Sequence, residues 1–174
     1  MDTRPADSPP SAHLLYLDFD GVLHPEDALW HPRRGVYLGP KSHGHALFEH
    51  VPLLVTALEP FPHVQIVLAT SWVRHRGFAA TLKRLPATLQ SRVVGATHHS
   101  VMQDKNWLVL PRWQQILGDV GRRRPARWVS LDDDYEGWPV EHLDKLVKTD
   151  GTLGLSRQGA ITELQQKLAQ WQPG

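Results

Sequence analysis

The feature that most constrains this chain is a regular alternation of short apolar runs with segments of helical periodicity. The apolar runs cover residues 14–19, 65–69, 92–96, 127–131 and, more weakly, 146–149. Runs of this kind are typical of strands buried on both faces, as in parallel sheets. Apolar residues recur at helical spacing over 45–58, 77–85, 111–120 and 161–171. Strands alternating with helices predict an α/β fold with right-handed crossovers.

One stretch, residues 24–44, does not fit this alternation. It is rich in proline and glycine, with Trp30 and Tyr37 between them. It is also too long for an ordinary strand-to-helix connection. We therefore expect a small flap or hairpin over the end of the first strand. The length of 174 residues favours one domain, which we place at 13–174 after a flexible lead-in at 1–12.

Composition excludes several classes of protein. The chain has no cysteine, so disulfides and thiolate metal sites are excluded. Its net charge of +1 gives no global attraction to nucleic acid. No apolar run approaches the roughly 18 residues of a membrane helix, and residues 1–11 lack the apolar core of a signal peptide. We expect a cytoplasmic protein with no membrane partner.

Polar residues stand where three of the predicted strands end. They are Asp18, Asp20, Thr70, Ser71, Asp132, Asp133 and Asp134. In an open parallel sheet, ligands bind beyond the carboxyl ends of the strands, so these side chains should line one crevice. Acids gathered in one place repel each other unless protons or a cation neutralise them. Oxygen ligands without cysteine favour a hard cation such as Mg²⁺.

The sharpest motif is Asp18-Phe19-Asp20-Gly21. Alternation along an extended chain sends Asp18 and Asp20 to the same side. One carboxylate can then attack phosphorus while the other transfers protons, and Gly21 allows a tight turn beside a phosphate. Each pattern alone has a plainer interpretation. The motif at 18–21 could belong to a calcium loop or a surface turn, and Thr70-Ser71 could cap a helix. The acids at 132–134 could likewise form a solvated turn.

Three segments together resemble the ordered motifs of the haloacid dehalogenase-like (HAD-like) superfamily. They are LLYLDFDGVLHP (14–25), VLATSW (67–72) and WVSLDDD (128–134). The resemblance covers about residues 13–171 and implies a three-layer, Rossmann-like fold around a parallel sheet of about five strands, without a large cap domain. In addition, RWQQIL (112–117) resembles a helix of a compact branch that includes phosphatase domains of RNA-repair proteins.

The resemblance also implies roles for individual residues. Asp18 would be the nucleophile and a metal ligand, and Asp20 the general acid/base and a ligand through its main-chain carbonyl. Thr70 would hydrogen-bond the phosphoryl group. Asp132 would bind Mg²⁺ directly, and Asp133 directly or through water. An acid at position 20 favours phosphoryl transfer over carbon–halogen cleavage.

The family also needs one basic residue, for which two candidates exist. Arg112 begins a predicted helix and is favoured, whereas Lys105 lies in a predicted loop. Further along, Trp72 could stack on a base and Arg74 could bind a second phosphate, although a core tryptophan and a solvated arginine are the plainer interpretations. Substrate contacts are expected from Gly21, His24, Ser71, Trp72, Arg74 and Lys105. The histidine pairs at 43/45 and 98/99 lack a third firm ligand, so we expect no metal there.

Taken together, the sequence predicts a HAD-like hydrolase. It would be a Mg²⁺-dependent phosphatase that acts on phosphomonoesters through an aspartyl-phosphate. The substrate would be a nucleotide, a nucleic-acid end or another small phosphorylated molecule. Two alternatives stay open: a non-catalytic module that binds metal and phosphate, and a phosphotransferase in which an acceptor hydroxyl replaces water. The sequence does not specify the natural substrate, the oligomeric state or the pathway.

Overall fold

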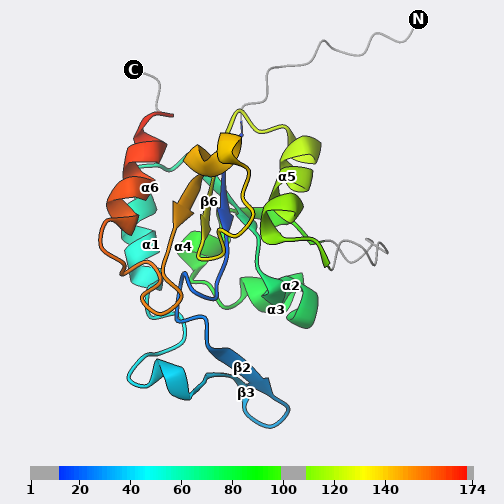
Figure 1. The fold of residues 1–174 in the computed structure, drawn as a ribbon, viewed down its shortest axis with the longest axis vertical. Coiled ribbons are helices and arrows are strands. Elements are labelled where there is room, and N and C mark those ends of the chain that lie inside the picture. Colours follow the sequence, from blue (N-terminus) through cyan, green and yellow to red (C-terminus); the bar gives the residue numbers. More distant parts are fainter. Residues whose placement is uncertain (1–11, 99–108, 172–174) are drawn as a thin grey trace, which may run out of the picture.

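The fold is built on one central sheet (Figure 1), in a computed structural model that describes residues 12–98 and 109–171. Five strands run in the order β5–β4–β1–β6–β7, and every neighbouring pair is parallel. The strands are β1 (His13–Leu17), β4 (Val64–Leu68), β5 (Val93–Ala96), β6 (Arg127–Asp132) and β7 (Leu146–Lys148). All five predicted strands are present, and the predicted α/β class is confirmed.

Strand β1 occupies the centre of the sheet, and its register decides what meets at the carboxyl edge. Leu17 lies opposite Leu68 of β4 and Leu131 of β6. The residues that follow these three positions therefore emerge side by side. Backbone hydrogen bonds continue the pairing one step further, because Asp18 N–H donates to the carbonyl of Leu131.

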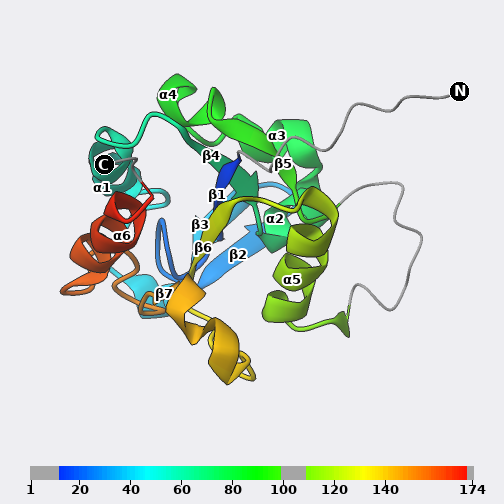
Figure 2. The same cartoon turned by 90° about the horizontal axis from the view of Figure 1, so that it is seen from above.

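Helices cover both faces of the sheet, which gives the predicted three layers (Figure 2). Side chains alternate along β1, so Leu15 and Leu17 face one way and Leu14 and Tyr16 the other. The first face packs against α1 (Val51–Leu58) and α6 (Ala160–Ala169). The second packs against α5 (Arg112–Arg123). Burial on both faces explains why the strand sequences are almost continuously apolar.

The shorter helices differ from the sequence prediction. Helix α1 begins at Val51 rather than at 45, because residues 43–50 form turns and Pro52 occupies the first helical turn, where no backbone donor is needed. The helix predicted at 77–85 is limited to α3 (Phe78–Leu82). Periodicity missed α2 (Ser71–Arg76) and α4 (Ala87–Gln90), each too short to show it. Two 3₁₀ turns, η1 (Pro40–Ser42) and η3 (Val140–Lys145), complete the described elements.

The predicted flap is a two-stranded antiparallel hairpin at the end of the molecule (Figure 1). It consists of β2 (Ala28–His31) and β3 (Gly35–Leu38), paired only with each other. Over 12–98 and 109–171 no cap domain is inserted in the fold. No helix in those ranges has the length and apolarity needed to cross a membrane. Of the expected lead-in at 1–12, only Ala12 is described.

Candidate active site

Asp18 lies at the centre of the site, immediately after β1, and is buried. Its Oδ1 accepts a 2.7 Å hydrogen bond from the backbone N–H of Phe19, and the Thr70 hydroxyl also bonds its carboxylate. Both contacts favour the charged form, but burial outweighs them and raises the pKa of Asp18. A buried carboxylate that neighbouring hydrogen-bond donors hold in one orientation is suited to nucleophilic attack.

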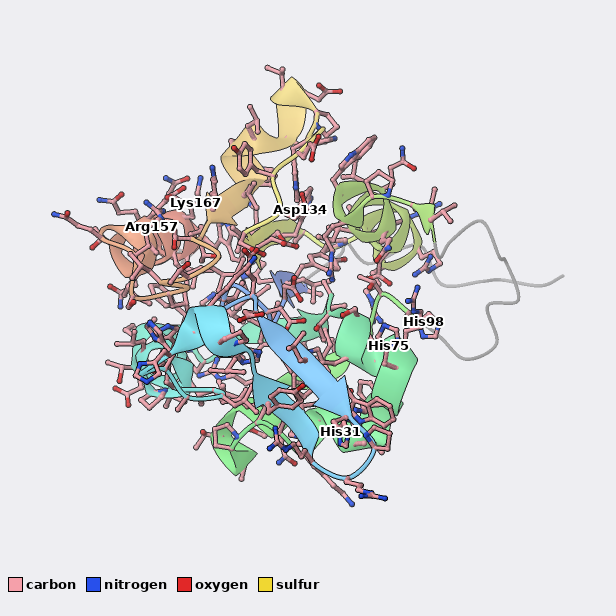
Figure 3. The ribbon with its side chains drawn as sticks, turned by 60° about the horizontal axis from the view of Figure 1, so that its bottom comes forward. His31, His75, His98, Asp134, Arg157 and Lys167 are labelled. Carbon is pink, nitrogen blue, oxygen red and sulfur yellow. The ribbon has the colours of Figure 1, made fainter. Side chains whose placement is uncertain are left out.

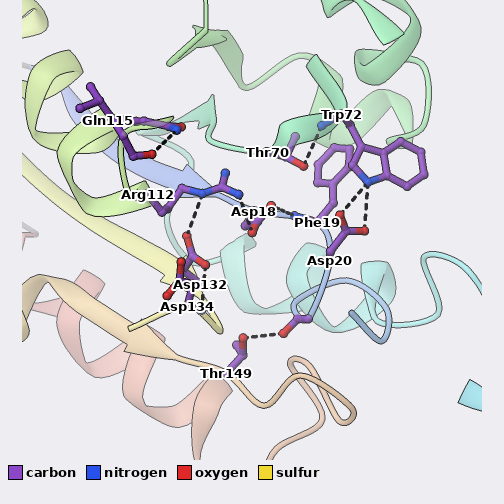
Figure 4. A network of polar contacts seen from close by, with 12 residues as sticks. Asp18, Phe19, Asp20, Thr70, Trp72, Arg112, Gln115, Asp132, Asp134 and Thr149 are labelled. Atoms are coloured by element: carbon purple, nitrogen blue, oxygen red, sulfur yellow. Dashed lines mark hydrogen bonds and ion pairs between the residues drawn. The ribbon is translucent and has the colours of Figure 1, made fainter. Parts of the chain in front are cut away.

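Arg112 links two of the acids (Figure 4). As predicted, it begins α5, and its guanidinium places Nη2 3.3 Å from Oδ2 of Asp18 and Nε 3.7 Å from Oδ2 of Asp132. Burial lowers the pKa of Arg112, but Asp18 and Asp132 outweigh this effect, so its pKa is raised. Arg112 is therefore the basic residue that the described structure brings to the site. Lys105, the alternative, lies outside the described residues.

Three carboxylates converge beside this arginine. Asp18, Asp132 and Asp133 each offer an oxygen, and these oxygens lie within 4.8 Å of one another. Burial and the charge of Asp18 raise the pKa of Asp132 well above its usual value. Burial, Asp18 and a hydrogen bond with Glu26 raise the pKa of Asp133 to about 7. Burial is the larger cause of these raised pKa values, and the neighbouring negative charges add to it.

These acids fit a hard divalent cation. Oδ2 of Asp132 is buried without a hydrogen-bond partner, and Nε of Arg112 approaches it only to 3.7 Å, so a cation there would complete its contacts. Carboxylate oxygens are the donors that Mg²⁺ prefers. Among the described residues, no other group of three acidic or histidine side chains is close enough to hold a metal. His98 is labelled in Figure 3; neither it nor the histidines at 43 and 45 belong to this group.

Gly21 is required for the position of Asp133. Its φ is +68°, and a Cβ at this position would overlap the Asp133 carboxylate. The carbonyl of Gly21 accepts a 2.6 Å hydrogen bond from the hydroxyl of Thr149, which follows β7. The turn after Asp20 is therefore held by the residue that follows the edge strand β7, and it leaves room for the third carboxylate.

Asp20 and Asp132 lie on opposite sides of Asp18 (Figure 4). Trp72 Nε1–H donates to both carboxylate oxygens of Asp20, at 3.0 and 3.1 Å, and Nε2 of His24 lies 2.9 Å from Oδ1. His24 itself is fully buried. It therefore contacts Asp20 and is not accessible to a substrate at the surface.

Asp20 also lines a cavity of about 480 Å³ between the hairpin and α2. The cavity walls are Asp20, Ala28, Leu29, Trp30, Val36, Ser71, Trp72, His75 and Arg76. Figure 3 looks onto the hairpin on this side of the molecule, with His31 and His75 labelled. The guanidinium carbon of Arg76 lies 5.5 Å from the centre of the Trp30 ring. The cavity is thus lined by one acid, by two tryptophans and by a cation.

The structure separates the candidate substrate residues into two groups. Ser71 and Trp72 line the cavity, whereas Arg74 is exposed, does not line it and contacts the neighbouring His75. Thr70 caps α2 by accepting a hydrogen bond from Trp72 N–H. It therefore both caps this helix and contacts Asp18 at the site. Sequence reasoning did not single out Glu26, in the proline-rich stretch, or Phe48, in the helix predicted at 45–58. Neither pattern indicates that Glu26 approaches Asp133 or that Phe48 approaches His24.

The fold, with acids at the ends of β1 and β6 and a hydroxyl at the end of β4, agrees with the class of protein that the motifs resemble, the haloacid dehalogenase-like domains. The model of one family, described as the HAD domain in Swiss Army Knife RNA repair proteins, matches residues 14–160, and the chain belongs to this family. Neither the curated proteins nor the solved structures gave a match.

Proposed function

We propose that this protein is a Mg²⁺-dependent phosphohydrolase that cleaves phosphomonoesters through an aspartyl-phosphate on Asp18. One observation carries the proposal: the buried Asp18 carboxylate lies against the Arg112 guanidinium and within reach of two further carboxylates. A phosphoryl group beside Asp18 would meet one fixed positive charge from the protein. The membership of a HAD family supports the same class of reaction.

The first half of the reaction transfers the phosphoryl group to the protein. A carboxylate oxygen of Asp18 forms a bond to phosphorus while the bond from phosphorus to the ester oxygen breaks. Arg112 binds the phosphoryl oxygens, on which negative charge accumulates. Asp20, in its protonated form, donates its proton to the leaving oxygen, so the alcohol departs uncharged.

The second half returns the protein to its starting state. Asp20, now a carboxylate, removes a proton from water as the water oxygen attacks phosphorus. The bond to Asp18 breaks, and inorganic phosphate and the free carboxylate are released. Asp18, Asp132 and Asp133 would hold Mg²⁺, whose charge offsets that of the transferring group when it is bound.

The shape of the site favours an ester whose alcohol carries a planar group. Asp20 must contact the leaving oxygen, so the alcohol extends into the cavity that Asp20 lines. Its volume of about 480 Å³ lies within the range of small-molecule sites. Trp30 is 59% exposed and offers a face for stacking, and Arg76 offers a positive charge beside it. A nucleotide or a phosphorylated nucleic-acid end fits these features, in keeping with the RNA repair named for the family.

The experiment is release of inorganic phosphate from a panel of phosphomonoesters, in Mg²⁺ and in EDTA. The panel contains mononucleotides, oligonucleotides phosphorylated at either end, and glycerol phosphate. We expect release only in Mg²⁺, with nucleotides or oligonucleotide ends preferred. Asp18→Asn should abolish release while the circular dichroism spectrum stays that of the wild type.

Three outcomes would refute parts of the proposal. Undiminished release by Asp18→Asn would exclude the covalent mechanism. The absence of release from every ester, in folded protein that binds Mg²⁺, would favour the non-catalytic binding module instead. Product that appears only with an added acceptor alcohol would identify a phosphotransferase.

A further inference from the structure

The carboxylate of Asp20 is held by two side-chain donors that act unequally on its oxygens. Oδ1 receives Nε2 of His24 at 2.9 Å and Nε1 of Trp72 at 3.0 Å. Oδ2 receives only the indole N–H of Trp72, at 3.1 Å. An indole nitrogen can donate and cannot accept, so Asp20 is the acceptor in both contacts with Trp72. Oδ1 is therefore the more fully occupied oxygen.

The backbone of Phe48 sets the direction of the contact between His24 and Asp20. The N–H of Phe48 lies 3.4 Å from Nδ1 of His24, and a backbone N–H can only donate. With Nδ1 as the acceptor, the ring proton is on Nε2 and is donated to Asp20. Phe48 has a φ of +60°, which is uncommon for a residue with a side chain. Such strain is maintained where the surrounding structure requires it.

Aromatic packing keeps both donors in place. The ring of Phe48 lies 4.8 Å from that of His24 and 5.4 Å from that of Trp72, centre to centre. Phe19 packs edge-on against Trp72 from the chain segment between the two acids, at 5.8 Å. His24 is 0% exposed and Trp72 is 6% exposed. Neither donor is free to turn toward solvent, so Asp20 is the fixed recipient of both.

We propose that His24 and Trp72 are positioning residues that fix Asp20 through Oδ1 and leave Oδ2 to exchange the proton with the leaving oxygen. The proposal rests on the proposed function, because it assumes that Asp20 protonates the alcohol. It reassigns two residues that the sequence indicated as substrate contacts. Their effect is one of orientation: a side chain with 28% exposure at the edge of a cavity would otherwise sample several rotamers.

The test separates proton donation from general packing by varying the leaving group. The ratio kcat/KM reports the steps up to loss of the alcohol, and an alkyl alcohol needs a proton far more than 4-nitrophenolate does. Trp72→Phe keeps an aromatic ring but deletes the donor. We expect it to lower kcat/KM about tenfold to a hundredfold for glycerol phosphate, but less than about threefold for 4-nitrophenyl phosphate.

His24 provides a second, independent variant. His24→Ala should show the same dependence on the leaving group, and His24→Gln, which retains an amide donor, should recover most of the lost activity. The matched control is Trp128→Phe, since Trp128 is 9% exposed and packs on the opposite face of the sheet. This control should lower kcat/KM for both esters equally or leave both unchanged.

A readout independent of turnover tests the contact itself. The indole N–H resonance of Trp72, assigned by its absence in Trp72→Phe, should shift in Asp20→Ala while that of Trp128 does not. An unshifted resonance would overturn the proposal. So would equal losses for the two esters in Trp72→Phe and His24→Ala, provided that the wild type releases phosphate. If the wild type releases phosphate from neither these two esters nor any other ester of the panel, the proposed function itself fails, and this inference fails with it.

Discussion

Arg112 approaches Asp18 with Nη2 3.3 Å from Oδ2, and both side chains are largely buried. The pair joins the carboxyl end of the central strand to the first residue of α5, two segments far apart in the sequence. The guanidinium offsets only part of the charge, because Asp132 and Asp133 lie on the same side of Asp18. This imbalance is the basis of the first two predictions.

Removing the guanidinium should impair turnover far more than removing the competing lysine. We expect Arg112→Ala to lower kcat/KM about a hundredfold or more, because a charge facing the phosphoryl oxygens is lost. Lys105→Ala should lower it less than about threefold. Arg122→Ala is the control, since Arg122 lies on the same helix and pairs with Asp119. A larger loss in Lys105→Ala than in Arg112→Ala would transfer the role to Lys105.

The stability of the metal-free protein should depend on the protonation of Asp133. Its pKa, raised to about 7, exceeds the ordinary value of 3.8. Between about pH 4 and pH 7 the folded state therefore binds more protons than the unfolded state, and Asp133 makes the free energy of unfolding fall as pH rises. Mg²⁺ should oppose this fall, because a cation favours the deprotonated carboxylates.

Urea unfolding at pH 5 and pH 7.5, in EDTA and in Mg²⁺, measures this effect. His13 and His50 act in the opposite direction, because burial lowers the pKa of each. The comparison is therefore between the wild type and Asp133→Asn, which removes the titrating group. In EDTA the variant should lose less stability than the wild type between the two pH values. An equal or greater loss in the variant would contradict the raised pKa.

Gly21 and Gly35 form a matched pair for testing the turn beside Asp133. Both have positive φ, at +68° and +73°, but a Cβ at Gly35 meets nothing within 4 Å. Gly35→Ala should cost about 1 kcal/mol from backbone strain alone. Gly21→Ala carries the same strain and also displaces the Asp133 carboxylate, so it should cost more and weaken Mg²⁺ binding. Calorimetric titration with Mg²⁺ and thermal unfolding check this; equal effects in the two variants would exclude the displacement.

Trp30 should determine selectivity rather than stability. It is 59% exposed on the hairpin, lines the cavity and lies against Arg76. We expect Trp30→Ala to raise KM about tenfold for nucleotide esters, through loss of stacking, with little change for glycerol phosphate. Tyr37→Ala is the control, because Tyr37 is on the same hairpin and lies against Arg34 but does not line the cavity. Equal changes in KM in both variants would show that the effect comes from disturbing the hairpin as a whole and not from stacking on Trp30.

The sequence alone was sufficient for the sheet and for the acids at its edge. Parallel strands buried on both faces are nearly continuous apolar runs. Because the strands are parallel, the polar residues at their carboxyl ends, such as Asp18 and Asp132, lie at the same edge of the sheet. Arg112 is predicted at the site because a resemblance supplies the expectation of a basic residue at a helix start, and the structure places its guanidinium beside Asp18.

The details that shape the cavity were not predictable in this way. The position of the hairpin relative to α2 depends on contacts between segments with no shared periodicity, such as Trp30 with Arg76. Similarly, His24 stands three residues after Gly21, so the sequence predicts that it touches substrate. Only the backbone conformation of Phe48 and the packing of rings around His24 direct it to Asp20 instead.

The central place of β1 has a consequence for how the protein folds. Its two neighbours, β4 and β6, come from well-separated parts of the chain, and β6 pairs with it only after most of the sequence has been made. Parallel pairing between distant segments forms slowly, because long loops must close first. Phosphate release during refolding should therefore appear only in the last kinetic phase, together with the slowest backbone protection, since the acids of the site meet only when the whole sheet is assembled.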